Sequence, residues 1–335
     1  MKSILTAFIL VLILGSCTPK KVTLTPYIFP YKSSMRGLFS VDENVSWSSG
    51  TNGYTFISIS NEWKGIQDTS WGSLDFRDVH SFSDKEAIIM SSGDSCKIYK
   101  TIDGAESWSL VYENNSEGIF FDGMDFWDDK NGLAFSDPVD NQLFIITTND
   151  GGDSWQNLVS VDLPQTLKGE AGFAASGTGI VCIGDSSVYI GTGGGETSRV
   201  FTSHNRGKSW LAIETPMMKG EASGIYSMTF MDELNGVAVG GNYLDSANTK
   251  GNCVFTSDGG LTWDLPKTPP TGYRSGVAHN GNGLLIATGR NGVDVSYDKG
   301  NNWKHVTDDA YYSVVLNGNS GWLSGRSKMA KIIIE

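Results

Sequence analysis

The stretch TSDGGLTW, residues 256–263, decides the fold because it returns along the chain in several copies. Within it, Asp258 can hydrogen-bond the backbone two residues on, and Gly259 and Gly260 accept the positive φ angles of a tight turn. The apolar residues before it and the tryptophan that closes it are typical of two strands joined by a hairpin. A single copy would indicate a turn and nothing more.

Four further copies diverge progressively from this spelling: TNDGGDSW at 148–155, TIDGAESW at 101–108, SHNRGKSW at 203–210 and SYDKGNNW at 296–303. Their closing tryptophans lie 40 to 55 residues apart along the chain. Between copies, the sequence repeats an apolar strand, an acidic turn and a second strand rich in small residues. Four short strands in a unit of this length are typical of one blade of a β-propeller.

The two ends of the chain complete the count of blades. Residues 39–63 keep the order of a blade but have lost the aspartate and glycines of the turn, and the last unit, which begins near Tyr311, stops after about three strands. A closed ring removes open sheet edges, which otherwise promote aggregation. We therefore expect an all-β, seven-bladed β-propeller with four-stranded blades over residues 22–335, in which an N-terminal strand near residues 22–29 completes the last blade.

The start of the chain has the features of an export signal. An apolar run is followed by LGSC (14–17), which resembles a bacterial lipobox. The sequence therefore predicts a signal peptide over residues 1–16, a lipid on Cys17 that attaches the protein to a membrane, and a tether over residues 17–21. The alternatives are an ordinary signal peptide or a short membrane anchor. Because Thr18 is not an aspartate, we expect the cell envelope of a Gram-negative bacterium, with the outer membrane as the default location.

Charge and residue composition argue against several classes of ligand and site. A net charge of −12 argues against nucleic acid, whose binding requires a basic face. The cysteines of the mature chain are odd in number, which favours buried thiols over a disulfide framework, and neither they nor the histidines have the spacing of a metal site. These residues are Cys96, Cys182, Cys253, His80, His204, His279 and His305. We expect one monomeric domain with no cofactor and no bound metal.

The repeated spelling resembles the Asp-box, also called the bacterial neuraminidase repeat. In the families that carry it, the motif lies on hairpins at the blade periphery, away from the mouth of the ligand-binding channel. The resemblance implies a structural role, in which the aspartates form turns and the tryptophans pack between sheets. The turn-forming positions are Asp103, Asp150, Asn205, Asp258 and Asp298.

A second resemblance covers nearly the whole mature chain. Stretches such as SGIYSMTF (223–230), VAVGGNY (237–243) and GYRSGVAH (272–279) look like a bacterial family of secreted propellers similar to the photosystem II stability and assembly factors. Some members of that family are labelled oxidoreductases. However, IGTGGGETS (190–198) has Glu196 in the last place of a G-x-G-x-x-G pattern and no βαβ unit around it, so the sequence contains no readable dinucleotide site.

Three arginines are candidates for a ligand site. When the blades are aligned, Arg77 in FRDVHSF and Arg274 in YRSGVAH occupy equivalent positions, and Arg36 is displaced by an even number of residues, on the same strand face. Because the inner strands of a propeller line its channel, we expect the three side chains near one mouth, where they could hold a carboxylate. The alternative is local ion pairing with carboxylates such as Asp78 and Asp122.

The arginines also resemble the triad of sialidases, and FRDV partly matches their Phe/Tyr-Arg-Ile-Pro signature. The Ile-Pro is absent, and a nucleophile and base can be assigned only as a combination of Tyr226 with Glu170 or Glu221. The sequence thus leaves two hypotheses of function. The favoured one is a non-catalytic binding or assembly scaffold for a protein, peptide or glycan, and the alternative is a glycoside hydrolase of the sialidase type.

The remaining candidates lie at the starts of inner strands, outside the glycine and aspartate turns. They are Glu170, Ser223, Tyr226, Tyr273 and Arg274. We expect them to gather with Arg77 at one channel mouth, remote from the motif turns, and to bind an anionic group or an extended peptide. The alternative interpretation is that the tyrosines pack between blades and that Glu170 pairs with Arg274.

Overall fold

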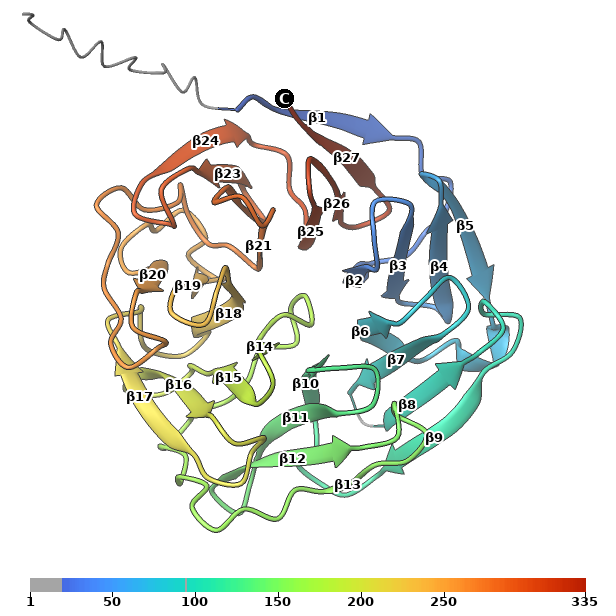
Figure 1. The fold of residues 1–335 in the computed structure, drawn as a ribbon, viewed down its shortest axis with the longest axis horizontal. Coiled ribbons are helices and arrows are strands. Elements are labelled where there is room, and N and C mark those ends of the chain that lie inside the picture. The colour runs from blue at the N-terminus through green and yellow to red at the C-terminus, as the bar shows by residue number, and fades with distance from the viewer. Residues whose placement is uncertain (1–19, 94) are drawn as a thin grey trace, which may run out of the picture.

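The computed structural model describes residues 20–93 and 95–335, so the predicted signal peptide and Cys17 lie outside the described residues. The described chain forms 27 strands and one 3₁₀ turn, η1 (Thr69–Trp71), and it contains no helix long and apolar enough to cross a membrane. The strands make seven antiparallel sheets arranged like blades around a central axis (Figure 1). The expected all-β, seven-bladed β-propeller is confirmed.

Each blade runs outward from an inner strand that lines the channel. The first three blades comprise β2 (Met35–Ser40), β3 (Val45–Gly50), β4 (Tyr54–Ile59) and β5 (Glu62–Gln67); β6 (Asp75–Ser81), β7 (Ala87–Ser92), β8 (Cys96–Thr101) and β9 (Ser109–Asn114); and β10 (Phe121–Phe126), β11 (Gly132–Val139), β12 (Gln142–Thr148) and β13 (Gln156–Asn157). The next three comprise β14 (Ile180–Ile183), β15 (Ser187–Gly191), β16 (Ser198–Ser203) and β17 (Leu211–Thr215); β18 (Ser223–Phe230), β19 (Gly236–Asn242) and β20 (Cys253–Thr256); and β21 (Gly276–His279), β22 (Leu285–Gly289), β23 (Gly292–Ser296) and β24 (Trp303–Thr307).

The seventh blade closes the ring with both ends of the chain. β25 (Ser313–Asn317), β26 (Ser320–Ser324) and β27 (Met329–Ile334) come from the C-terminus, and β1 (Val22–Tyr27) is the outermost strand. β1 pairs antiparallel with β27 along its whole length, as Figure 1 shows. The N-terminal strand therefore supplies the missing fourth strand, as expected.

The described blade β18-β19-β20 has no regular fourth strand. Its outer position is held by an isolated bridge between Phe255 and Asp264. The chain that follows contains Pro266, Pro269 and Pro270. Proline has no amide donor, so this segment cannot extend a hydrogen-bonded ladder.

The repeated motif forms a turn that its own side chains close. In the copy at residues 101–108, Asp103 Oδ1 accepts hydrogen bonds from Thr101 Oγ1 at 2.8 Å and from the Ser107 amide at 2.9 Å, and Oδ2 accepts one from Ser107 Oγ at 2.6 Å. These bonds, chiefly those from Ser107, lower the pKa of Asp103 to about 2. Corresponding bonds from the residues two before and four after recur at Asp150, Asn205, Asp258 and Asp298.

The motif turns distinguish the two faces of the ring. Each turn follows the third strand of its blade, which runs parallel to the inner strand, so the turns lie on the face where the inner strands end. Backbone hydrogen bonds tie them to the hairpins on that face, from Gly104 to the Lys85 carbonyl and from Gly151 to the Lys130 carbonyl, both at 2.9 Å. We call this the exit face, and the face where inner strands begin the entry face.

Apolar side chains pack between neighbouring blades and hold the inner strands in place. Between β15 and β18, for example, Tyr189 stacks on Phe230 with ring centroids 4.0 Å apart. Each of the three described cysteines is a free thiol; Cys96 and Cys253 are buried and Cys182 is half-buried. The ring is thus a rigid support for side chains at its two channel mouths.

Candidate ligand-binding site

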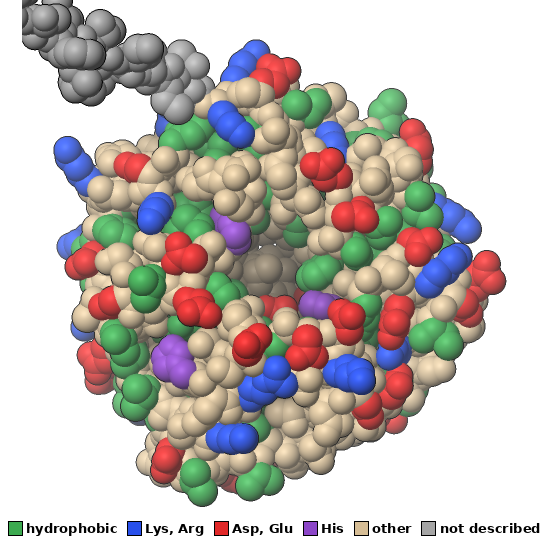
Figure 2. Space-filling model, in the orientation of Figure 1, with side chains coloured by type: hydrophobic (Ala, Val, Ile, Leu, Met, Phe, Trp, Pro, Cys, Tyr) green, Lys and Arg blue, Asp and Glu red, His purple; other side chains and the backbone are tan. Residues whose placement is uncertain are grey.

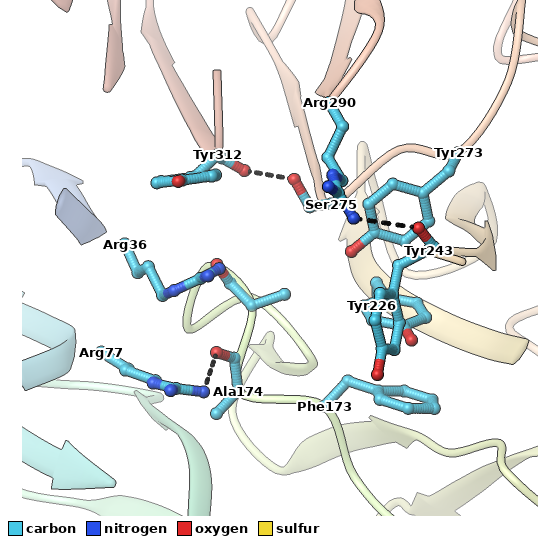
Figure 3. Close-up of a pocket in the computed structure, with 11 residues that line it drawn as sticks. Arg36, Arg77, Phe173, Ala174, Tyr226, Tyr243, Tyr273, Ser275, Arg290 and Tyr312 are labelled. Carbon is cyan, nitrogen blue, oxygen red and sulfur yellow. Dashed lines mark hydrogen bonds between the residues drawn. The ribbon is translucent and has the colours of Figure 1, made fainter. Parts of the chain in front are cut away.

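The entry face contains a cavity of about 440 Å³ at the mouth of the channel. Arginines from β2 and β6 form one wall, and aromatic side chains form the opposite wall (Figure 3). None of the eleven described residues that line it is an aspartate or glutamate. They are Arg36, Arg77, Phe173, Ala174, Ala175, Tyr226, Tyr243, Tyr273, Ser275, Arg290 and Tyr312.

β-Bulges aim three of these side chains into the cavity. The pairing register shifts around Arg36 in β2, around Arg77 in β6 and around Tyr226 in β18. A bulged residue has no partner in the neighbouring strand, and the local bend re-aims its side chain. Bulges lie at the same place in four blades, and three of them present a side chain to the cavity. The fourth, in β10, carries Asp122, which is buried beneath Gly172.

Backbone carbonyl groups hold the two inner arginines. Arg36 Nη1 donates to the Ala175 carbonyl at 3.2 Å, and Arg77 Nη1 donates to the Ala174 carbonyl at 3.4 Å. Arg77 Nε also donates to Asp75 Oδ2 at 2.8 Å. Burial lowers the pKa of Arg36, and the nearby positive charge of Arg77 lowers it further. Two guanidinium groups this close favour an anion that hydrogen-bonds to both.

A third arginine stands at the rim of the cavity. Arg290, in the turn between β22 and β23, is exposed and donates from Nη1 to the Tyr243 carbonyl at 3.1 Å. Burial raises the pKa of the Tyr273 hydroxyl, and the charges of Arg36 and Arg290 both oppose that rise. The two arginines therefore act electrostatically on the same aromatic ring, from opposite sides of the cavity (Figure 3).

The aromatic wall is rigid. Phe173 and Tyr226 stack with ring centroids 3.9 Å apart, and Tyr273 meets Tyr226 edge-on at 4.8 Å. The Tyr226 hydroxyl donates to the Ala222 carbonyl at 3.0 Å, which fixes the ring, and burial raises the pKa of Tyr226. A ligand with an apolar or planar part beside an anionic group would match the two walls together.

The floor of the cavity is formed by residues 171–178, which we call the channel segment. Figure 1 shows this connection to β14 projecting toward the middle of the ring. Ala174 and Ala175 line the entry cavity, whereas Gly177 and Thr178 line a second cavity of about 250 Å³ at the exit mouth. The channel segment therefore lies between the two cavities.

Hydroxyl groups and a glycine fit the channel segment to the surrounding blades. Ser176 Oγ donates to the Ser275 carbonyl at 2.7 Å, and Thr178 Oγ1 hydrogen-bonds Ser227 Oγ at 2.6 Å. Gly177 has a φ of 76°, and a Cβ there would lie 2.1 Å from a carboxylate oxygen of Asp78. Only glycine fits this position without displacing that carboxyl group.

One buried and one half-buried carboxyl group lie at the exit mouth. Asp78 Oδ2 accepts the Met124 amide and Asp125 Oδ2 accepts the Cys182 amide, both at 2.7 Å, so each carboxyl group links its blade to the next. Burial raises the pKa of Asp78 to about 8 and of Asp125 to about 7, and lowers that of His80 to about 3. Acidic and histidine side chains are visible around the central hollow in Figure 2.

The structure brings four of the sequence-predicted residues together and separates a fifth. Arg36, Arg77, Tyr226 and Tyr273 line the entry cavity, on the face opposite the motif turns. Arg274 does not join them, which corrects the expected arginine cluster. It is fully buried, and its Nε and Nη2 donate to Asp294 Oδ2 at 2.8 and 2.5 Å. It precedes β21 outside any bulge, and because neighbouring residues of an extended chain point to opposite sides, Tyr273 rather than Arg274 faces the cavity.

Two further candidates also lie away from the cavity. Glu170 is buried and pairs with Arg199, whose Nε donates to Glu170 Oε1 at 3.0 Å, so the expected alternative of a pair with Arg274 is wrong. Ser223 is buried and accepts a hydrogen bond from Asn242 Nδ2 at 3.0 Å. Because the Tyr226 hydroxyl donates to a backbone carbonyl, it makes no pair with Glu170 or Glu221.

The local-pairing alternative holds for Arg77 and Arg274, but with other carboxylates than the expected Asp78 and Asp122. The carboxylate bonded to Arg77 is Asp75, whereas Asp78 accepts backbone amides and Asp122 lies buried beneath Gly172. Sequence reasoning missed several lining residues on connections between strands, namely Phe173, Tyr243, Arg290 and Tyr312. The arginine in the tight turn GRNG (289–292) was a usable signal, because turns of this kind rarely need a long cationic side chain.

No family model matches the chain. Among curated proteins, it is similar to a xyloglucanase of Paenibacillus sp, with 26% identity over 258 residues. That match covers 65% of this chain and 24% of the xyloglucanase, so the chain spans about a quarter of that relative's length.

Solved structures with the same fold include two of YCF48. The first, YCF48 bound to D1 peptide, has a TM-score of 0.67 and 14% identity, and the match covers 96% of this chain and 97% of that one. YCF48 from Cyanidioschyzon merolae has a TM-score of 0.64 and 16% identity over 92% and 98% of the two chains. YCF48 is a photosystem II assembly factor. The expected resemblance to such propellers is confirmed in the fold. The RRP9 WD40 repeats share the fold too, with a TM-score of 0.62 and 12% identity over 94% and 97% of the chains.

Proposed function

We propose that the protein is a non-catalytic binding scaffold whose entry-face cavity holds an anionic group of an extended peptide. The observation that carries this proposal is the placement of Arg36 and Arg77 in one cavity whose described lining contains no carboxylate. Asp75 occupies only Nε of Arg77, and among the described residues neither arginine uses Nη2 in a hydrogen bond. The Nη2 donors, held by a rigid frame and without a hydrogen-bond acceptor among the described residues, favour an external carboxylate.

A peptide is the favoured ligand for two reasons. The cavity combines guanidinium groups with fixed aromatic rings, so it can contact both the charged and the apolar parts of a polypeptide. In addition, one of the structures that share this fold is YCF48 bound to D1 peptide, which supports a peptide as the class of ligand.

The proposal is tested by selecting peptides and then removing the arginines. Peptides are enriched from a random phage-displayed library on the wild-type protein, and the best synthetic peptides are measured by calorimetry. The double variant Arg36→Ala/Arg77→Ala should bind them at least about 10- to 100-fold more weakly, because each lost charge-assisted hydrogen bond contributes about 1.5–3 kcal/mol. Arg206→Ala, which removes a half-buried arginine paired with Asp128 on the exit face, is the control. Equal binding by all three proteins would contradict the proposal.

We propose that a lipid on Cys17 anchors the scaffold in the cell envelope, by default at the outer membrane. The LGSC stretch after an apolar run supports this placement. Intact-mass analysis of the protein from membranes should show an acylated Cys17 as the first residue. Cys17→Ser should move the protein out of the membrane fraction, and an unmodified chain that retains residues 1–16 would overturn this part of the proposal.

A second candidate function is glycoside hydrolysis, which the similarity to a xyloglucanase favours. Hydrolysis of this kind normally requires two carboxyl groups flanking the scissile bond, and the described lining of the entry cavity contains none. Release of reducing sugar from xyloglucan, or of sialic acid from sialyllactose, is the decisive assay. Release by the wild type that Arg36→Ala/Arg77→Ala abolishes would replace the scaffold with an enzyme, the latter substrate indicating the sialidase type.

A further inference from the structure

The loop between β19 and β20 carries exposed apolar side chains beside the entry cavity. Tyr243 lines the cavity and is 41% exposed, and Leu244, the next residue, is 71% exposed. We call these two residues the shelf. Single exposed apolar side chains are common, but two that continue the wall of a cavity form a patch of the kind that marks recognition surfaces.

The shelf is continuous with the aromatic wall. The rings of Tyr243 and Tyr226 meet edge-on at 6.5 Å. Arg290 lies where the wall and the shelf meet, and its hydrogen bond to the Tyr243 carbonyl ties the loop to the neighbouring blade (Figure 3). A ligand that leaves the cavity on this side therefore passes over an apolar surface next to a positive charge.

Hydrogen bonds on both sides hold the loop that bears the shelf. Asn242 Oδ1 accepts the Leu244 amide at 2.8 Å. The Ser246 carbonyl accepts hydrogen bonds from Asn291 Nδ2 at 2.9 Å and from the Tyr273 amide at 2.8 Å. Because the loop is already ordered, burying Leu244 against a ligand would cost little further conformational entropy.

We propose that the shelf is a second subsite that takes a large apolar side chain of the same peptide whose anionic group lies against Arg36 and Arg77. This inference rests on the proposed function and narrows its ligand to peptides with an acidic group and, a few residues away, a side chain such as that of Leu, Ile or Phe. An oligosaccharide has no aliphatic group of this kind, so the shelf favours a peptide over a glycan. The arginines supply charge recognition, and the shelf supplies selection by side-chain size.

The test repeats the phage selection on four proteins: the wild type, Leu244→Ser, Tyr243→Ser/Leu244→Ser and Ile102→Ser. Ile102 is 73% exposed on a motif turn of the exit face, so its substitution is a matched control for the loss of an exposed apolar side chain. Peptides from the wild type and from the control should share an acidic residue and a large apolar residue at a constant spacing. Peptides from the two shelf variants should keep the acidic residue and lose the apolar one.

Affinities of one synthetic peptide pair complete the test. The best wild-type peptide is compared with the same peptide carrying Ser at the apolar position. The wild type should prefer the apolar peptide by about 10-fold or more, in keeping with burial of one large apolar side chain, and the double shelf variant should bind both peptides equally. Unchanged urea midpoints show that the variants are folded.

The outcomes separate this inference from the proposed function. Selected peptides that need Arg36 and Arg77 but show no apolar preference, or whose preference survives in the double shelf variant, overturn the shelf alone. Selected peptides that bind regardless of the arginines overturn the proposed function. A library that yields no enriched peptide overturns both.

Discussion

Arg36 donates a hydrogen bond at 3.2 Å to the carbonyl oxygen of Ala175, a residue 139 positions further along the chain. Arg77, one blade on, makes the corresponding bond to Ala174. Two blades from the start of the ring thus hold a segment that comes from its middle. The donors proposed to bind the ligand and the floor beneath the ligand are therefore a single structural unit.

Removing these donors should loosen the channel segment. In Arg36→Ala/Arg77→Ala, two hydrogen bonds of about 1 kcal/mol each are lost, so amides such as that of Gly172, which donates to Asp137 Oδ1, should exchange about 10- to 30-fold faster. Hydrogen exchange read by mass spectrometry over residues 168–180 checks this. Arg206→Ala should leave the rate unchanged, and unchanged exchange in the double variant would mean that the carbonyl bonds do not stabilise the segment.

Arg274 should matter for stability and not for binding. Arg274→Ala leaves the fully buried Asp294 carboxylate without its cation, and the free energy of unfolding should fall by about 3–5 kcal/mol. The paired change Arg274→Met/Asp294→Leu removes both charges and should recover most of that loss. Urea titrations measure both effects. A loss below about 1 kcal/mol in the single variant would show that water or other groups compensate Asp294.

Stability should fall as the pH rises from about 6.5 to 8. Folding raises the pKa of Asp78 to about 8 and that of Asp125 to about 7, so the folded chain keeps protons that the unfolded chain releases near pH 4. Their contribution is complete below about pH 4 and is lost as the pH rises through 7 and 8. His80, with its pKa lowered to about 3, has the opposite effect, because its contribution is complete above pH 6.5 and is lost as the pH falls.

Chemical unfolding at several pH values measures the slope of the free energy of unfolding against pH. Asp78→Asn and Asp125→Asn should each flatten it, even though each substitution also lowers stability by leaving a backbone amide poorly matched. Asp103→Asn is the control, because the pKa of Asp103 is lowered to about 2, so its titration lies outside the window. A slope that is the same in all four proteins would contradict the assignment.

Substitutions in the closing strand β1 should lower the stability of the ring only on the buried side of the strand. Leu24 packs against the apolar core of the last blade, whereas Thr25 is exposed. Leu24→Asp should lower the free energy of unfolding by about 2 kcal/mol or more and produce higher oligomers in gel filtration, because release of β1 exposes the edge of β27. Thr25→Asp should stay within about 0.5 kcal/mol of the wild type and remain a single species. Equal behaviour of the two variants would argue against closure by β1.

Most of the fold could be predicted because its information is local and repeated. Each motif turn is specified by residues within six positions of one another, as the bonds from Thr101 and Ser107 to Asp103 show. The periodicity then fixed the number of blades, and the short last unit identified the closing strand. The irregular blade was harder to anticipate, since its effect depends on where Pro266 falls relative to a ladder rather than on any periodic pattern.

The candidate site was predictable only in part, because it depends on strand pairing and on contacts between residues distant in the sequence. Arg36 and Arg77 were found because they lie on inner strands, but the bulges that aim them into the cavity depend on pairing register, which a sequence does not display. Arg274 follows an aromatic residue, as the cavity residue Arg77 does, and yet it pairs with Asp294. Successive residues of an extended chain point to opposite sides, so a shift of one residue turns the side chain away from the cavity. Tyr243 and Arg290 lie on connections whose paths are set by tertiary contacts.

The channel segment determines how a polypeptide can occupy this protein. Residues 171–178 stand between the two cavities, so a bound chain cannot pass through the channel from one face to the other. It must leave by the mouth through which it entered. The site is therefore open to a loop in the interior of a protein as well as to a tail.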